Sequence, residues 1–335
     1  MLNLRQRWLS NWLSTALKLL PGTLLLILLV SQTSGDKLNA AFSNFSAPYA
    51  MLACGFLICA NVNRAIRFWV LARKQMPLVE AYRLTTTYNL ITALVPGGLG
   101  ELYLPYAVER DYKMPYAKGL SLLAITRLID LIAVAVLLVI GTFGLAYSSP
   151  QLWILAPIGI VLLLVLLAAL YNIDHVMQFV EHQTRRIPLL VPLTRFLGKF
   201  TLAFRQLRAE AVGSVRMTVI GTTILLWLFA WGNVTMMLYT LGLPLNLTQV
   251  ALGMGIIFST GVLPLSGLAN FGIRDAGWAF VLILTLGLAR EQAVAAAFAV
   301  HLVTLLCVFV VWVSGHMGHW LLHVPPPLAN ESESR

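Results

Sequence analysis

Long apolar runs, many of around 20 residues, recur along this chain from end to end. A run of that length can cross a hydrocarbon core about 30 Å thick as one α-helix. Of the 335 residues, 59% are hydrophobic and only 11% are charged, whereas an ordinary soluble domain has about 25% charged residues. Because so little polar surface could not keep the chain in water, we expect an integral membrane protein, with one membrane domain over residues 1–324.

About eight hydrophobic segments can be delimited. They are residues 16–30, 48–70, 118–146, 152–170, 218–241, 251–263, 276–288 and 293–313. A short Ser-Ser-Pro turn at 148–150 separates the third segment from the fourth, so these two should pair as a helical hairpin. The fold class is therefore predicted to be all-α and polytopic. The tail, residues 325–335, is rich in Pro and Glu and is expected to be disordered.

The basic residues indicate how the chain crosses the membrane. The formal net charge is +10, and the cations lie unevenly between the apolar runs. A cluster ending in Arg73 and Lys74 follows the second run, and the polar loop 172–216 is also rich in arginine. The positive-inside rule places both in the cytoplasm and the loop containing Lys37 outside. We expect a multi-pass protein of the cell inner membrane with a cytoplasmic N-terminus, and the charge needs no nucleic-acid partner.

Two halves of the chain, about 16–146 and 152–316, resemble one another weakly. In each half a hydrophobic segment ends in a Pro/Gly break, at 96–101 and at 264–272. An adjacent Arg-Asp pair follows each break: Arg110-Asp111 and Arg274-Asp275. If each broken segment re-enters the side it came from, the halves form an inverted repeat. In transporters such paired breaks indicate a substrate site near the membrane midplane.

The breaks also predict a polar cavity. Backbone groups left unpaired in lipid cost several kcal/mol each, so breaks persist only where protein or a water-filled cavity surrounds them. The backbone positions expected beside this cavity are Gly97, Gly98, Gly100, Asn270 and Gly272. Asn270 is compatible with a left-handed backbone. The alternative is a pair of plain interfacial loops in which Pro and Gly only stop helices.

Charged residues inside apolar segments are the candidates for binding. Arg127 and Asp130 share a helix face three residues apart, and we expect them to pair with each other or with a facing helix. A structural ion pair explains them as well as a functional one. Glu101, Arg274 and Asp275 follow the two breaks and could face a common cavity suited to a zwitterionic or anionic headgroup. Their alternative role is that of solvated charges at helix ends.

Other polar groups in the apolar segments are more simply explained. Arg64 and Arg67 could attract anionic headgroups, but side chains snorkelling to the membrane edge are the preferred interpretation. His301 has no second ligand at metal-binding spacing, so a hydrogen-bonded core histidine is preferred over a proton relay. The preferred role of the last histidines, at 316, 319 and 323, is interfacial and not metal-binding.

Several classes of chemistry receive no support from the sequence. Cys54, Cys59 and Cys307 lie in apolar segments and are interpreted as small core residues. There is no phosphate-binding loop, no Gly-x-Ser-x-Gly motif and no metalloprotease His pair. We therefore assign no catalytic residue, no metal and no cofactor.

The motifs also resemble those of a known family, the lysylphosphatidylglycerol synthase transmembrane region, the flippase-like membrane part of multiple peptide resistance factor proteins. The resemblance covers about residues 15–315. It rests on the order and spacing of four short stretches: 96–101, 126–130, 263–277 and 288–293. Where the family usually has Gly-Leu-Gly-Val-Arg-Glu, this chain has Asn270-Phe271-Gly272-Ile273-Arg274-Asp275. An Arg that often follows the first glycine turn is missing at Leu102-Tyr103-Leu104.

The resemblance implies a function in moving lipid between leaflets. The cargo would be a phospholipid or another lipid, and the aminoacyl-transferase domain of some relatives is not expected. Two alternatives stay open. One is a membrane-embedded enzyme of lipid or glycan assembly that uses the same carboxylates as acid and base. The other is a non-catalytic membrane partner of a lipid synthase.

Overall fold

The structure, a computed structural model, describes residues 35–95, 98–146, 155–172, 201–202, 205, 213–260 and 268–321. These residues form helices and turns without a strand, which confirms the all-α prediction. The helices are α2 (Gly35–Phe42), α3 (Ala47–Leu71), α4 (Leu78–Leu94), η1 (Leu99–Leu102), α5 (Tyr103–Tyr112), α6 (Tyr116–Ala146), α7 (Leu155–Tyr171), α10 (Ser214–Thr240), α11 (Leu247–Thr260), η4 (Leu268–Asn270), α12 (Ile273–Leu286) and α13 (Arg290–Leu321).

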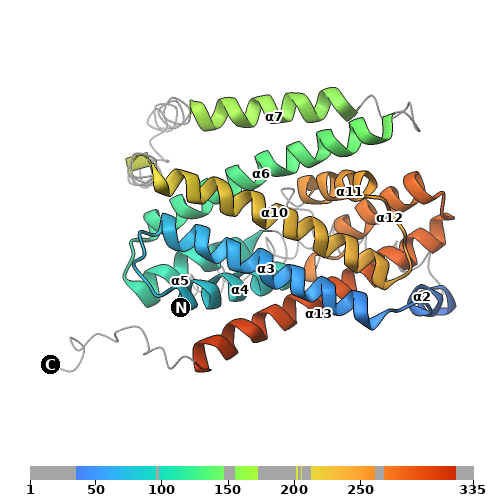
Figure 1. The fold of residues 1–335 in the computed structure, drawn as a ribbon, viewed down its shortest axis with the longest axis horizontal. Coiled ribbons are helices and arrows are strands. Elements are labelled where there is room, and N and C mark those ends of the chain that lie inside the picture. The colour runs from blue at the N-terminus through green and yellow to red at the C-terminus, as the bar shows by residue number, and fades with distance from the viewer. Residues whose placement is uncertain are drawn as a thin grey trace, which may run out of the picture.

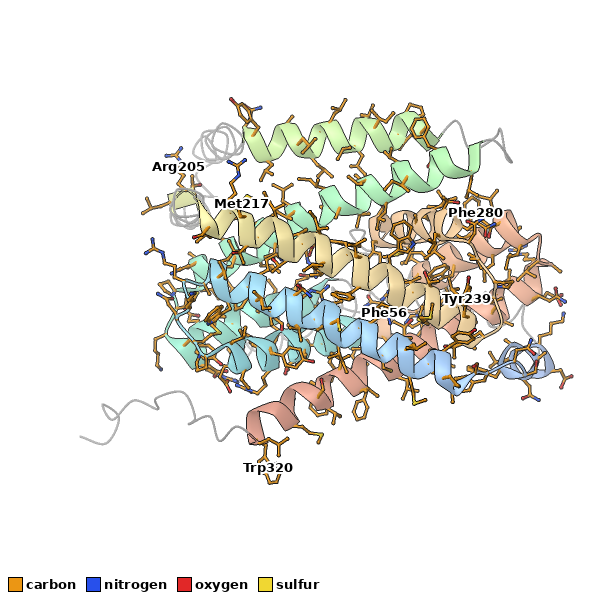
Figure 2. The ribbon with its side chains drawn as sticks, in the orientation of Figure 1. Phe56, Arg205, Met217, Tyr239, Phe280 and Trp320 are labelled. Atoms are coloured by element: carbon orange, nitrogen blue, oxygen red, sulfur yellow. The ribbon has the colours of Figure 1, made fainter. Side chains whose placement is uncertain are left out.

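Among the described residues, four helices are long and apolar enough to span a membrane. They are Ala47–Leu71, Tyr116–Leu145, Ser214–Thr240 and Arg290–Gly318. Shorter apolar helices accompany them, and α7 packs against α6 as the predicted hairpin. Large apolar side chains such as Met217 and Phe280 point outward over the bundle (Figure 2). The arrangement is that of a polytopic membrane protein, as predicted.

Two ends of the bundle can be distinguished by contacts between helix termini. At one end, Lys118 at the start of α6 contacts Gln75, which follows α3 (Nζ to Oε1 3.4 Å). This is the basic end, and it carries Arg73, Lys74, Arg83, Arg110, Lys113, Lys118, Arg205 and Arg216. Arg205 is labelled there in Figure 2. At the other end, the Ser46 N–H before α3 donates to the Thr240 carbonyl at the end of α10 at 2.9 Å. That opposite end carries Asp36, Lys37, Arg290 and Glu291.

The packing of the helices is preserved when the two halves are exchanged. The long helices α3 and α10 run antiparallel and lie side by side (Figure 1). Helix α4 packs on α13, and its counterpart α11 packs on α6, the counterpart of α13. In the same way α5 packs on α6, and α12 packs on α13. This is the packing expected of an inverted repeat.

Both broken segments return to the end from which they entered. The Tyr112 hydroxyl at the end of α5 donates to Glu80 Oε2, at the start of α4, at 2.7 Å. At the opposite end, Gln249 Nε2 in the first turn of α11 donates to the Thr285 carbonyl of α12 at 3.3 Å. Each segment therefore enters from its own end of the bundle, turns at its break and goes back (Figure 1).

Glycines let the two halves approach closely where α6 crosses α11. A Cβ added to Gly141 of α6 would come within 2.5 Å of the Leu252 Cα, and one on Gly255 of α11 within 2.7 Å of the Leu138 Cα. Such small residues are typical of helix pairs in membranes, where close packing drives association. The α6·α11 contact therefore holds the halves together backbone to backbone.

A few sequence boundaries differ from the structure. The stretch expected to be a plain outer loop contains a helical turn, α2, and residues 214–216 begin α10 instead of ending the predicted loop 172–216. A polar helix of this length has no periodic apolar face long enough to be recognised. The segment 16–30, most of the loop 172–216 and the tail 325–335 lie outside the described residues.

Candidate functional site

The two helix breaks, far apart in sequence, meet inside the bundle. Asn270 in the second break donates its side-chain amide to the carbonyls of Thr92 at 2.7 Å and Ala93 at 3.2 Å. These carbonyls lie in the last turn of α4, where no further helix is available to pair them. Asn270 and Ala269 have left-handed backbones with φ of 59° and 51°. Asn270 thus adopts the left-handed backbone with which its residue type is compatible.

The predicted glycines serve the backbone geometry of the breaks. Gly98, at φ 73°, precedes η1, and Gly272, at φ 105°, precedes α12. Both angles are strained for residues with a side chain. A Cβ on Gly100 would come within 2.7 Å of the Thr92 Cα, so only glycine lets η1 pack on α4. Gly97 lies outside the described residues.

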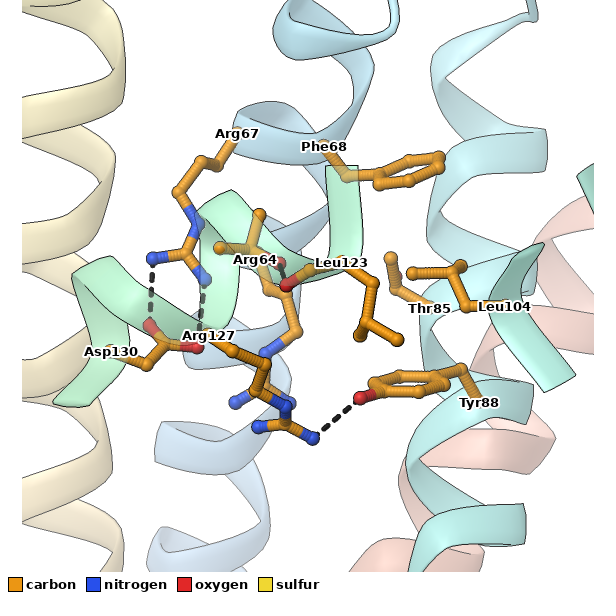
Figure 3. Close-up of a pocket in the computed structure, with 10 residues that line it drawn as sticks. Arg64, Arg67, Phe68, Thr85, Tyr88, Leu104, Leu123, Arg127 and Asp130 are labelled. Atoms are coloured by element: carbon orange, nitrogen blue, oxygen red, sulfur yellow. Dashed lines mark hydrogen bonds and ion pairs between the residues drawn. The ribbon is translucent and has the colours of Figure 1, made fainter. Parts of the chain in front are cut away.

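Arg127 and Asp130 do not pair with each other, and each finds its partner on another element. Arg67 of α3 holds Asp130 with two parallel bonds, Nη1–Oδ1 at 2.8 Å and Nη2–Oδ2 at 3.0 Å (Figure 3). Arg127 binds Glu101 of η1, with Nε–Oε2 at 2.9 Å, and both contact the Tyr88 hydroxyl of α4. Of the two possibilities raised by the sequence, pairing with a facing element is the correct one.

The preferred interpretation of Arg67 as a snorkelling residue is wrong. Its side chain is only 1% exposed, because α6 and α10 cover it: Asp130 pairs with it, and Thr223 accepts a bond from Nη1 at 3.2 Å. Sequence alone could not show this, since a residue near a helix end is buried only if other helices extend past it. Trp227 of α10 also donates to Asp130 Oδ1 at 3.3 Å.

Arg64 is held differently, by amides. Its Nη1 donates to Asn89 Oδ1 of α4 at 2.6 Å, and the Asn89 amide donates in turn to Asn61 Oδ1, one turn earlier on α3. No carboxylate forms an ion pair with Arg64 in the part of the chain that the structure describes. These asparagines were not predicted from the sequence, although amides on the same apolar segments as Arg64 were a signal that could have indicated them.

These side chains surround a small polar pocket. Its lining residues are Arg64, Arg67, Phe68, Thr85, Tyr88, Leu104, Leu123, Thr126, Arg127 and Asp130. Figure 3 shows the guanidinium group of Arg127 joined to the hydroxyl of Tyr88. The pocket holds about 20 Å³, room for about one water molecule. Three arginines against Asp130 and Glu101 leave this pocket with one excess positive charge.

The charges of the second break form a separate cluster. Asp275, 1% exposed, accepts the Gly272 N–H at 2.7 Å and so caps α12; its other oxygen lies 2.8 Å from His301 Nδ1. Arg274 is half-buried, and no hydrogen bond or ion pair holds its guanidinium within the described residues. Neither Arg274 nor Asp275 lines the pocket of the first half. The common cavity expected for both breaks is thus not the pocket seen here.

The remaining sequence predictions concern cysteines and histidines. Cys54 and Cys307 are core residues with sulfurs 3.2 Å apart, whereas Cys59 is exposed, so its interpretation as a core residue is wrong. His301 is a hydrogen-bonded core histidine, 4% exposed, as preferred from sequence. His316 lies 3.0 Å from the Trp312 carbonyl of its own helix. No cluster of potential metal ligands occurs among the described residues.

The basic end has a polar cluster of its own. Glu80, 2% exposed, pairs with Arg83 at 2.8 Å and accepts a bond from the Tyr112 hydroxyl at 2.7 Å. Burial, reinforced by the hydrogen bond to Glu80, raises the pKa of the Tyr112 hydroxyl. The hydroxyl therefore stays a proton donor and fastens α5 to the start of α4.

A comparison with known proteins places the chain in a family. The model of the lysylphosphatidylglycerol synthase TM region matches residues 13–311. The chain belongs to that family. The resemblance inferred from the sequence motifs is thereby confirmed, and the match includes both helix breaks and all the charged residues described above. No curated protein and no solved structure matches the chain. The family is a membrane domain associated with lipid handling.

Proposed function

We propose that the protein moves a phosphate-bearing lipid between the two leaflets of a membrane, with the headgroup in the polar pocket and the tails in the bilayer. The observation that carries this proposal is the excess positive charge at the pocket. Arg67 is neutralised by Asp130, and Arg127 by Glu101. Within the described residues, Arg64 is held by the Asn89 amide and by no carboxylate.

An uncompensated guanidinium inside a membrane protein is costly, so it requires a functional or structural reason. Arg64 lies seven residues before the end of α3, which corresponds to about 10 Å along the helix axis. Guanidinium groups match phosphate oxygens in charge and geometry. The negative charge of a headgroup phosphate beside Arg64 would neutralise the pocket.

The surroundings of the first break suit the lipid tails. Large apolar side chains are exposed on both sides of it. These are Leu94 at the end of α4, Leu99 and Leu102 of η1, and Tyr106 of α5. Hydrocarbon tails could lie on these residues while the headgroup occupies the pocket next to η1.

The pocket must widen before a headgroup can enter, because its present volume admits about one water molecule. The short helices on either side of the breaks are suited to such a movement. Helix α4 ends at Val95, whose backbone is extended, and α12 begins after Gly272, whose φ is 105°. Neither helix continues across the bilayer, so each can tilt without breaking a long helix.

The charge distribution orients the protein in this proposal. The basic end carries eight of the described cations against Glu80, Glu109 and Asp111, whereas two cations and two acids balance at the opposite end. The positive-inside rule then puts the basic end in the cytoplasm. The proposed location is the cell inner membrane, and the proposed partner is a membrane lipid. If that lipid is a modified one, a lipid synthase would supply it.

A vesicle assay tests the function. The purified protein is reconstituted into phosphatidylglycerol/phosphatidylcholine vesicles that contain a trace of headgroup-labelled fluorescent phosphatidylglycerol, and a membrane-impermeant quencher reports the label in the outer leaflet. With the protein, the fraction quenched should rise from the outer-leaflet share toward all of the label. Arg64→Gln should slow this rise, whereas Arg216→Gln, which removes an exposed cation from α10, should not.

Two results would contradict the proposal. Quenching limited to the outer-leaflet share, as in protein-free vesicles, would show that no lipid moves. Conversion of the labelled lipid to a new species on thin-layer chromatography, without a change of leaflet, would favour the membrane-embedded enzyme instead.

A further inference from the structure

The imidazole of His301 lies between two hydrogen-bond acceptors. Its Nδ1 is 2.8 Å from Asp275 Oδ1, and its Nε2 is 3.0 Å from the Ala269 carbonyl oxygen. A carbonyl oxygen has no proton to donate, and a neutral imidazole carries one N–H only. The second nitrogen of a neutral ring would therefore present a lone pair to an acceptor. Both contacts are favourable only if the site holds one more proton.

Two features place this proton on the ring. Asp275 Oδ2 accepts the Gly272 N–H at 2.7 Å, which stabilises a carboxylate. The Phe271 ring stacks on the imidazole with centroids 4.1 Å apart and planes 21° from parallel. The face of an aromatic ring attracts a cation. An imidazolium beside a carboxylate thus satisfies every contact, and the buried pair is neutral as a whole.

Loss of the proton would be costly at this position. Asp275 and His301 are 1% and 4% exposed, so a neutral imidazole would leave an uncompensated carboxylate away from water, which is strongly unfavourable. It would also leave the Ala269 carbonyl against a lone pair. Arg274, next to Asp275 in sequence, is the cation that could then move toward the carboxylate.

The titratable groups that α2, α3 and α4 bring to α13 are bonded to residues other than His301. Helix α2 brings Lys37 to Glu291 at the opposite end, and α4 brings Tyr82 to Ser314 at the basic end. Helix α3 brings Cys54 to Cys307, and α10 contacts Thr304 through Met237. From α12, Asp275 faces His301 directly and Arg274 adjoins it. Among the described residues, Asp275 is thus the charged partner of His301.

The proton is connected to both helix breaks through a series of contacts. The Nε2–H binds the carbonyl of Ala269, whose left-handed backbone costs energy and must be held by its surroundings. The next residue, Asn270, binds the carbonyls at the end of α4. Gly100 packs on Thr92 in that same turn, and Glu101 follows it and binds Arg127 at the pocket.

We propose that Asp275 and His301 form a proton-binding site whose proton holds the second helix break against the first. Release of the proton from Nε2 to water removes the bond to Ala269, and the two breaks can then separate; no other bond is broken. The coupling of lipid movement to proton binding and release rests on the proposed function, whereas the proton site itself does not.

The proton itself can be observed without any transport. Protein labelled with ¹⁵N-histidine in lipid vesicles is examined by solid-state NMR at about pH 7.5, where a histidine in water is mostly neutral. We expect one histidine with both ring nitrogens protonated, and this signal should be missing in His301→Gln. In Asp275→Asn the amide oxygen can still cap α12 but the counter-charge is gone, so His301 should show one unprotonated nitrogen.

A structural role alone would not give this pattern. A His301 signal with one unprotonated nitrogen in the unmodified protein at that pH would overturn the proton site. A doubly protonated His301 that persists in Asp275→Asn would overturn the role of the carboxylate.

The coupling is tested in the vesicle assay at equal pH on both sides, at about pH 6.5 and about pH 8.5. These values lie on either side of the range in which histidines usually change charge. The rate of lipid movement should differ about tenfold or more between the two pH values, because the free energy of one charge-assisted hydrogen bond corresponds to about that ratio. In His301→Gln, whose amide can still bind Ala269, the rates should be equal.

Equal rates in the unmodified protein would overturn the coupling and leave the proposed function standing. No lipid movement at either pH would remove the proposed function and the coupling together, while the NMR result still decides the proton site.

Discussion

Asn270 donates its side-chain amide to the carbonyl oxygen of Thr92, 178 residues earlier in the chain, at 2.7 Å. This bond and its neighbour to Ala93 connect the two helix breaks, each of which enters from its own end of the bundle. The two bonds satisfy carbonyls that α4 leaves unpaired at its end, in a partly buried part of a membrane protein. The two halves are therefore joined at their helix breaks.

Asn270→Ala should destabilise the protein. The variant loses both bonds and leaves two α4 carbonyls without a donor, at a cost of about 1–3 kcal/mol for a buried group. Thermal unfolding in detergent, followed by circular dichroism, measures the effect. Asn172→Ala, at an exposed position after α7, is the control and should change stability by less than about 0.5 kcal/mol. Equal melting of both variants would show that the Asn270 bonds contribute nothing.

The Arg67–Asp130 pair should behave as a buried ion pair. Asp130→Asn leaves the Arg67 charge uncompensated at 1% exposure, which should cost about 3–5 kcal/mol. The double variant Arg67→Met/Asp130→Leu removes both charges and should recover most of that loss. Melting temperatures of Arg67→Met, Asp130→Leu and the double variant form the measurement. If the loss in the double variant equals the sum of the two single losses, the two residues do not interact.

Gly141 should not tolerate a methyl group. A Cβ there would lie 2.5 Å from the Leu252 Cα, and overpacking of this kind costs about 1–3 kcal/mol. Gly221 of α10 is the matched control, because a Cβ there meets nothing within 4 Å. Gly221→Ala should be neutral or stabilising by up to about 1 kcal/mol. The α6·α11 contact would be wrong if Gly141→Ala melted as high as Gly221→Ala.

Cys54 and Cys307 should form a disulfide when the protein is oxidised in its membrane. Their sulfurs are 3.2 Å apart, and a movement of about 1 Å brings them to bonding distance. Treatment with copper phenanthroline, followed by digestion and mass spectrometry, should find the Cys54 and Cys307 peptides cross-linked. Cys59, exposed on the same helix, should remain outside any internal cross-link. A Cys54–Cys59 or Cys59–Cys307 product would contradict the packing of α3 on α13.

Much of the fold was predictable because hydrocarbon imposes strict local conditions. Runs such as 118–146 and 293–313 had to be helices, since only a helix satisfies its own backbone in lipid. The Pro/Gly stops at 96–101 and 264–272 marked the breaks for the same reason. The weak likeness of the halves predicted the re-entrant arrangement, which the paired helix ends at Glu80 and Tyr112 confirm.

The partners of the charged side chains were not predictable in the same way. Arg127 and Asp130 share a helix, yet Glu101 binds one and Arg67 binds the other. Arg67 lies near the end of α3, and from its sequence environment a snorkelling side chain was expected. It is buried because α6 and α10 cover it. Spacing along one helix shows which residues share a face but not which helix that face meets.

The sequence by itself thus determined that the chain spans a membrane as helices, where those helices break and which residues carry charge inside them. These properties follow from each segment's own length, hydrophobicity and backbone requirements. Only the tertiary structure decided that the breaks meet at Asn270, that Arg64 is left with an amide partner, and that His301 lies between Asp275 and Ala269. Such contacts join residues from distant helices, so they depend on how the whole bundle packs.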